Sequence, residues 1–177
     1  MTEITHLTAV QLSEAIHSRS VSCVEVMDAF LERINTLNPD LNALVNLMTP
    51  ETCLAMARES DRQLSGGNSA GWLHGIPIAI KDLFNAKGLA TTLGSPMFPE
   101  AGAHQDDPHV ARIRAAGALI IGKTNVPEAG LGGHTCNALF GLTRNGLDRS
   151  LSAGGSSGGA ATAVSSHMLP LADGSDM

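Results

Sequence analysis

The segment Ser152-Ala-Gly-Gly-Ser-Ser-Gly-Gly-Ala-Ala-Thr-Ala-Val164 is the most informative stretch of this 177-residue sequence. Four glycines flank two adjacent serines, and glycine permits positive φ and the close approach of another chain or a ligand. The small residues from Ala160 to Val164 follow at once and predict a core helix. Serines at a helix N-terminus either cap it or present hydroxyls beside N–H groups that favour negative charge. The residues by themselves leave both a functional site and a flexible linker open, although a linker would continue its low-complexity composition.

Short apolar strands and helices alternate around this stretch. The segment Gly75–Ile80 (GIPIAI) predicts a buried strand that leads into Lys81. The other expected elements are a helix over Asp107–Ala116 ended by Gly117, a strand over Ala118–Ile121, a helix over Val126–Leu131, a helix over Gly158–Ser166 and a strand over Met168–Ala172. This alternation predicts an α/β fold with a mixed, mostly parallel sheet flanked by helices.

The first 65 residues have the apolar spacing of helices. Ser22 and Glu25 form a capping box at the start of the strongest one, and Asn38-Pro39 is expected to end it. The expected elements are helices over Thr8–Ser18, with Thr8 as its cap, Ser22–Leu37 and Pro50–Leu64, and an extended segment over Leu41–Met48. We therefore divide the chain into an N-terminal helical layer, residues 1–65, and the first part of an α/β core, residues 66–177. Because the chain ends in a glycine-bearing turn after a predicted strand, we expect a domain truncated before completion.

Composition excludes several classes of function. The net charge of −6 and the absence of a basic run argue against nucleic acid and against docking to an anionic membrane. The N-terminus lacks the basic and apolar regions of a signal peptide, and no apolar run is long enough to span a bilayer. Three widely spaced cysteines indicate free thiols in a reducing compartment and neither a disulfide framework nor a metal site. The expected location is the cytoplasm.

One motif matches a phosphate-binding loop by letter alone. Gly117-Ala-Leu-Ile-Ile-Gly-Lys-Thr124 fits GxxxxGK[ST], which would make the protein a nucleotide-binding one. A phosphate-binding loop needs a strand before its first glycine, whereas here a helix precedes Gly117 and four apolar residues fill the loop. We interpret the segment as a helix stop followed by a core strand, with Lys123 in a structural contact or near the site. Saturable ATP binding that is lost in Lys123→Ala would overturn this interpretation.

Several segments together resemble the amidase signature family. AGGSSGGAATAV (153–164) resembles the core of the signature, and GIPIAIKDLF (75–84) resembles the strand of the catalytic lysine. Between them, the segments 106–128, GLTRN (141–145) and LDRS (147–150) resemble the intervening parts of the family in order. The likeness runs from about Leu73 to Met177 and implies the family's large α/β fold.

The resemblance implies a Ser–cis-Ser–Lys triad that cleaves amides without a metal or organic cofactor. Lys81 corresponds to the lysine that acts as base in its neutral form, and Ser156 to the bridging serine, whose peptide bond is cis in the family. A desolvated amine favours its neutral form and can accept a proton. The residues expected to support the loop are Gly154, Gly155, Ser157 and Gly158. Asp82 is expected to have a structural role.

The family's nucleophilic serine is expected just beyond Met177. Gly174-Ser-Asp-Met177 matches the first four residues of the family segment G-[TS]-D-x-G-G-S. Ser175, Asp176 and Met177 are therefore expected at the oxyanion hole or behind the triad, where backbone N–H groups stabilise developing charge. Without the nucleophile, we expect the 177-residue chain to be inactive alone.

Four interpretations of function remain open. The leading one is a fragment of an amidase that converts a small-molecule carboxylic amide to an acid and ammonia or an amine. A sibling is the glutamine-hydrolysing subunit of a tRNA-dependent amidotransferase, whose members usually carry Asn-Pro-Trp-Asp where this chain has Asn145-Gly-Leu-Asp148. A non-catalytic scaffold or binding fragment is the third, and cysteine chemistry at Cys136 near His134 is a remote fourth. The expected protein partner is a second copy of the chain or the missing C-terminal half.

Overall fold

Two parallel strands form the centre of the chain. The structure is a computed structural model that describes residues 3–98 and 102–176. Strand β2 (Pro77–Lys81) runs parallel to β3 (Leu119–Thr124), so that Lys81 lies opposite Thr124. The short strand β1 (Leu44–Val45) pairs with β3 in the antiparallel direction, which gives the order β1-β3-β2. The prediction of a mixed, mostly parallel sheet is confirmed.

The N-terminal helices begin where the sequence predicts. They are α1 (Ala9–His17), α2 (Cys23–Leu41) and α3 (Pro50–Ser65), preceded by the 3₁₀ turn η1 (Ile4–His6). The hydroxyls of Thr8 and Ser22 accept hydrogen bonds from the backbone N–H of Gln11 and Glu25, and both pairs form complete capping boxes.

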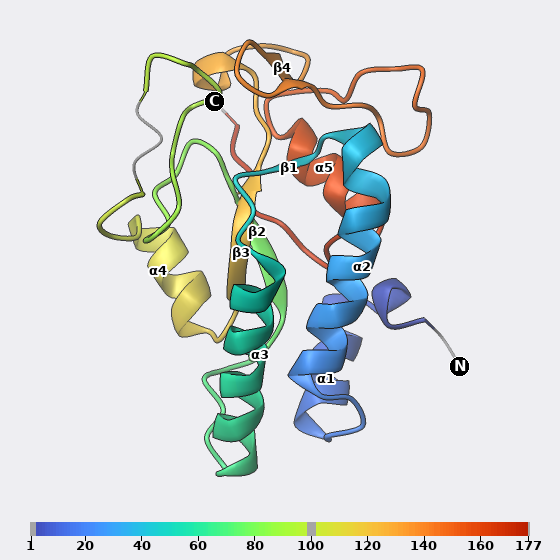
Figure 1. The fold of residues 1–177 in the computed structure, drawn as a ribbon, viewed down its shortest axis with the longest axis vertical. Helices are drawn as coiled ribbons and strands as arrows, with labels where there is room; N and C mark the ends of the chain where they lie inside the picture. The colour runs from blue at the N-terminus through green and yellow to red at the C-terminus, as the bar shows by residue number, and fades with distance from the viewer. Residues whose placement is uncertain (1–2, 99–101, 177) are drawn as a thin grey trace.

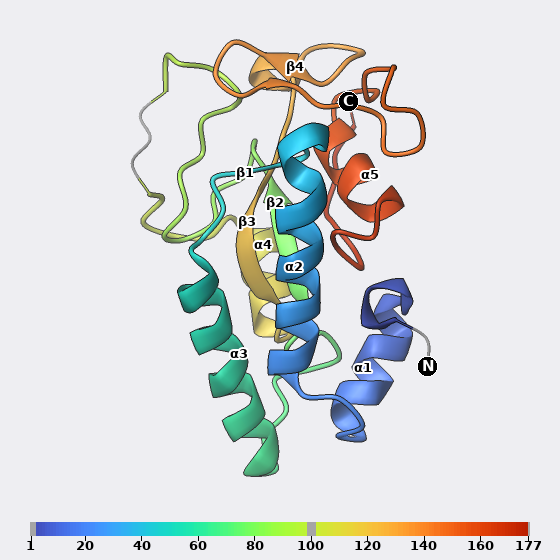
Figure 2. The ribbon, with the colours of Figure 1, turned by 45° about the vertical axis from the view of Figure 1, so that its right-hand side comes forward.

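Helices cover the sheet from both sides. Figures 1 and 2 show α4 (Pro108–Ala115) on one side, and α2 with α5 (Gly158–Ser165) on the other. Helix α3 packs against both α2 and β3. A single apolar cluster contains buried side chains from five of these elements: Phe30, Ile78, Val110, Ile120 and Ala163. The N-terminal helices and the sheet therefore share one core.

The irregular segments gather at one end of the sheet, where β2 and β3 finish (Figure 1). They include the turn η2 (Glu128–Gly130), the hairpin of β4 (Cys136–Asn137) and β5 (Gly141–Leu142), and the C-terminal segment. In α/β folds, ligands bind at the carboxyl ends of parallel strands. We therefore expect a functional site at this end of the sheet.

Four predicted elements differ from the structure. Helix α2 continues through Pro39 to Leu41, because the Asn38 side chain accepts the N–H groups of Ala43 and Leu44 and so organises the exit from the helix. Correspondingly, only Leu44–Val45 of the expected extended segment is a strand.

The helix predicted over Val126–Leu131 is also wrong. Only the turn η2 forms there, and Ala129 has a φ of 54°. The backbone N–H of Ala129 donates to the carbonyl of Leu93, and Ser95 donates to the Glu128 carboxylate at 2.6 Å. Contacts with a distant loop thus replace the helical hydrogen bonds.

The strand predicted over Met168–Ala172 does not form either. Met168 and Leu169 are buried as expected, but their N–H groups bond to the carbonyl of Ala163 at the end of α5. Apolar residues of this kind indicate that a segment is buried, but a buried segment need not pair with a neighbouring strand.

Among the residues that the structure describes, no helix combines the length and the hydropathy needed to cross a bilayer.

Candidate active site

The amine of Lys81 lies among three serine hydroxyls. Every residue of β2 is buried, and Lys81, its last residue, has no exposed surface. Its Nζ is 2.8 Å from Ser156 Oγ, 2.9 Å from Ser157 Oγ and 2.9 Å from Ser175 Oγ. The carbonyl oxygen of Ser175 lies at 3.2 Å from the same nitrogen. These residues come from three segments of the chain, and the fold brings them to one point.

Burial decides the charge balance at this lysine. Removal of the amine from water lowers the pKa of Lys81 below its ordinary value, while the negative charges of Asp173 and Asp176 act in the opposite direction. A lysine with a lowered pKa can accept a proton from an adjacent hydroxyl. The geometry therefore allows proton exchange between Lys81 and the serine cluster.

The glycine–serine loop reaches this lysine because its glycines allow close contacts. The peptide bond between Gly155 and Ser156 is cis. A Cβ on Gly155 would collide with the backbone carbonyl of Gly132, and one on Gly158 would collide with the side chain of Thr135. Larger residues at these two positions would push the loop away from its neighbours.

Thr135 holds the loop from behind and was missed by the sequence analysis. It is fully buried, its Oγ1 donates to the carbonyl of Gly154 at 2.8 Å, and it accepts the N–H of Gly158 at 3.1 Å. The residue lies next to Cys136 in an irregular segment, where no periodicity or motif marks it. Only its tertiary contacts reveal its role.

The C-terminal segment closes the cluster. Ser157 Oγ donates to the carbonyl of Ser175 and accepts the N–H of the same residue, both at 3.2 Å. Asp176 lines a cavity of about 340 Å³ together with Ser156, Ser157 and Ser175. Of the residues expected at this place, Met177 lies outside the described residues. Asp173, which the sequence analysis missed, accepts the backbone N–H of Lys81 at 2.6 Å.

Comparison with known proteins assigns the chain to a family. The family profile described as Amidase matches residues 25–177. The chain belongs to the amidase family. A glutamyl-tRNA(Gln) amidotransferase subunit from Methylobacillus flagellatus is 43% identical over 94% of this chain, and the corresponding subunit from Rhodococcus erythropolis is 42% identical over 99%. The match covers 34% and 36% of those relatives, so the chain spans about a third of their length.

Solved structures of amide hydrolases share the fold of this amidase chain. A fatty acid amide hydrolase superimposes with a TM-score of 0.90 at 29% identity, over all of this chain and 32% of its own. The peptide amidase of Stenotrophomonas maltophilia and a bacterial aryl acylamidase each give a TM-score of 0.86 at 33% identity, over 94% of this chain and 35% and 34% of their own. The expectation of an amidase-signature fold is confirmed.

A second lysine of the amidase chain, Lys123 of β3, is buried on the face of the sheet opposite to Lys81, because it pairs with Ile80, the residue before Lys81. Lys123 has no exposed surface; its amine donates to the carbonyl of Phe84 and to Thr91 Oγ1, and lies 3.6 Å from the Asp82 carboxylate. Asp82 also accepts hydrogen bonds from Thr92 N and Oγ1. Lys123 and Asp82 together fix the loop after β2. Because the residues before Lys123 form the core strand β3, they do not make a phosphate-binding loop.

The histidine beside Cys136 is engaged elsewhere. His134 Nδ1 lies 3.0 Å from Ser152 Oγ. The hydrogen bond between His134 and the exposed Cys136 is one of the backbone, in which the His134 carbonyl accepts the Cys136 N–H. The described part of the chain holds no cluster of three or more His, Cys, Asp or Glu side chains suited to a metal ion.

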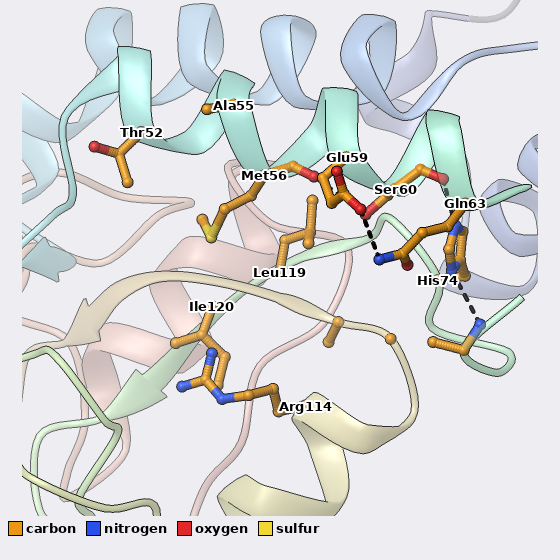
Figure 3. Close-up of a pocket in the computed structure, with 13 residues that line it drawn as sticks. Thr52, Ala55, Met56, Glu59, Ser60, Gln63, His74, Arg114, Leu119 and Ile120 are labelled. Carbon is orange, nitrogen blue, oxygen red and sulfur yellow. Dashed lines mark hydrogen bonds between the residues drawn. The ribbon is translucent and has the colours of Figure 1, made fainter.

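A larger cavity, of about 470 Å³, lies between α3, α4 and β3 (Figure 3). Several of its polar side chains already have hydrogen-bond partners. Gln63 donates to Glu59, and the His74 ring pairs with the carbonyl of Ser60. Arg114 donates two hydrogen bonds to the Asp106 carboxylate. This cavity offers no group poised for chemistry, whereas the smaller one contains the Lys81 cluster.

Proposed function

We propose that the protein containing this chain hydrolyses a carboxylic amide to an acid and ammonia or an amine, with Lys81 as base and Ser156 as bridging serine. The observation that carries the proposal is the 2.8 Å contact between a fully buried lysine amine and Ser156 Oγ. Membership of the amidase family supports the reaction class.

The proposed chemistry is a proton relay. Neutral Lys81 accepts the proton of Ser156 while Ser156 accepts one from the nucleophilic serine, whose oxygen attacks the amide carbon. Lys81 then returns its proton to Ser156, and Ser156 protonates the leaving nitrogen, which departs. Water releases the acyl group in the same way: it gives a proton to the relay and attacks the acyl carbon, and the relay returns the proton to the nucleophilic serine. By the family resemblance, the nucleophile follows the Gly174–Met177 segment, and Ser175 and Asp176 stand beside the oxyanion. The reaction uses these side chains without a cofactor.

Activity of the whole protein tests this proposal. Lys81→Met and Ser156→Ala should each reduce kcat by about 10²–10⁴-fold, the usual contribution of a proton-transfer group. Lys87→Met is the matched control, because Lys87 is an exposed lysine a little further along the chain. Full activity in Lys81→Met would refute the proposed base.

A second test separates the chain from the whole protein. The intact mass of the purified protein shows whether it is the 18.3 kDa chain or a longer one. A serine-directed fluorophosphonate should label the longer protein and leave residues 1–177 unlabelled. Labelling of residues 1–177 at Ser156 or Ser175 would contradict the assignment of the nucleophile. A protein of 18.3 kDa without amidase activity would favour the scaffold interpretation.

The second candidate function is glutamine hydrolysis within a tRNA-dependent amidotransferase. Identities of 42–43% to amidotransferase subunits favour it over the 33% identities to the aryl acylamidase and peptide amidase structures. The departure at Asn145-Gly-Leu-Asp148 favours a general amidase. Release of labelled ammonia from glutamine, stimulated by partner proteins and charged tRNA, would support the amidotransferase. Hydrolysis of simple amides without partners would support the general amidase.

Location and assembly belong to the same proposal. Three free thiols, two of them buried, fit the reducing cytoplasm. The partner that the reaction requires is the remaining part of an amidase polypeptide, and a homodimer is the alternative assembly.

A further inference from the structure

Asp173 ties the C-terminal segment to the strand that carries Lys81. Its Oδ1 accepts the backbone N–H of Lys81 at 2.6 Å, and its side chain is 8% exposed. A hydrogen bond from an amide to a buried carboxylate is among the stronger ones in proteins. Asp173 therefore fixes the backbone from which the amine extends into the serine cluster.

The second oxygen of the same carboxylate faces a histidine. His109 Nε2, on α4, lies 3.4 Å from Asp173 Oδ2, and the His109 side chain is 39% exposed. The Phe84 ring packs edge-on against the imidazole, with ring centroids 4.3 Å apart. The imidazole is thus held between an aromatic ring and a carboxylate while part of it meets solvent. Histidine is the side chain whose charge changes most readily near neutral pH.

We propose that Asp173 and His109 form a positioning pair for Lys81, in which the carboxylate anchors the lysine and biases its charge state, and the imidazole moderates that bias. The effect on rate rests on the proposed amide hydrolysis. The coupling itself is a property of these three residues and can be measured without turnover.

The electrostatic signs support this coupling. Burial lowers the pKa of Lys81, and the charge of Asp173 raises it again, so Asp173 opposes the neutral amine that a base requires. An N–H donor or a positive charge on His109 offsets the carboxylate and favours the neutral amine. Two other interactions bear on these groups. The negative charge of Asp176 also acts on Lys81, and Asp173 attracts Lys123, which Asp82 and Asp107 attract as well.

The chain is well suited to a direct test because it contains only three lysines, Lys81, Lys87 and Lys123. With ¹³Cε-labelled lysine, NMR can follow each amine as pH changes. Asp173→Asn, which keeps an acceptor for the backbone N–H, should lower the pKa of Lys81. His109→Leu should raise it, and His109→Gln, which keeps a donor but cannot be charged, should raise it less.

A double variant decides whether His109 acts through Asp173. In the Asp173→Asn background, His109→Leu should no longer move the Lys81 titration. The exposed Lys87 is the internal control, and His17→Gln on α1 is the control for loss of a remote histidine. If Asp173→Asn does not fold, the single His109 variants still carry the test, because the His109 side chain is partly exposed and tolerates replacement more readily. An unchanged Lys81 titration in His109→Leu, or an equal shift in both backgrounds, would overturn the proposal.

Rates in the whole protein give the functional readout. The acid limb of the kcat/KM profile should move to lower pH in Asp173→Asn and to higher pH in His109→Leu. Well below the Lys81 pKa, the rate should change by the factor by which the neutral fraction of Lys81 changes. Shifts in the NMR titration without any amide hydrolysis would refute the proposed function and leave the positioning pair intact. Rates that move against the NMR shifts would overturn the link between the pair and the base.

Discussion

Replacing Gly159 by alanine tests how closely the start of α5 must approach the rest of the fold. Gly159 is buried, and its N–H donates to the carbonyl of Asn125 at 3.2 Å. A Cβ at this position would lie 2.6 Å from the carbonyl oxygens of Ala43 and Asn125, and closer still to the Asn125 nitrogen. These neighbours are backbone atoms, so a rotamer change cannot relieve the collision.

The size of the effect follows from three contributions. Overpacking of a closely packed site costs about 1–3 kcal/mol. The weakened hydrogen bond to Asn125 adds about 1 kcal/mol. The helix preference of alanine over glycine returns about 1 kcal/mol at most. The free energy of unfolding should therefore fall by about 1–3 kcal/mol, which for a chain of this length lowers Tm by about 2–12 °C.

Urea and thermal unfolding of the chain, followed by circular dichroism, measure this loss. Gly154→Ala is the matched control: Gly154 is exposed in the same loop, and a Cβ there would meet nothing within 4 Å. The control should change stability by less than about 0.5 kcal/mol. Equal stability of Gly159→Ala and the unaltered chain, or equal losses in the two variants, would refute the close approach of α5 to Asn125.

Three other predictions follow from the site. Thr135→Val removes both hydrogen bonds behind the glycine–serine loop and should lower the free energy of unfolding by about 1–3 kcal/mol in urea, while Thr135→Ser should restore most of it. Lys123→Met leaves the buried Asp82 charge unpaired and should lower it by about 3–5 kcal/mol; a smaller loss in the double variant with Asp82→Asn would show that the unpaired charge is the cause. The folded pKa of Lys81 lies below its ordinary 10.5, so the unfolded chain binds more protons between the two values and stability should rise with pH across that window. Lys81→Met should reduce this slope in unfolding measured at several pH values, and an unchanged slope would mean that Lys81 does not titrate there.

The elements that the sequence predicted correctly depend on local interactions. The capping boxes of α1 and α2 need only residues three positions apart. Gly117, which follows the last turn of α4, has a φ of 96° and stops the helix, because glycine adopts this backbone conformation without strain. Local hydrogen bonds and steric limits are encoded within a few residues, so a sequence pattern is enough to find them.

The predictions that failed depend on distant residues. The segment Val126–Leu131 has the composition of a helix, but Leu93 and Ser95 bind its polar groups. Pro39 is a good helix stop by its own chemistry, yet the Asn38 side chain and the buried Leu41 extend α2 beyond it. A local rule cannot include partners that reach the segment only after folding.

The sequence by itself determined the family resemblance, the order of the main elements, and Lys81 and Ser156 as the residues to examine. Only the tertiary structure decided that the hydroxyls of Ser157 and Ser175 contact the Lys81 amine, that Asp173 anchors the lysine backbone, and that Lys123 lies on the face of the sheet opposite to Lys81. The reason is physical: these contacts join segments separated by up to 94 positions. Their strength depends on the burial that the complete fold creates, because the same groups would be solvated and separate in the unfolded chain.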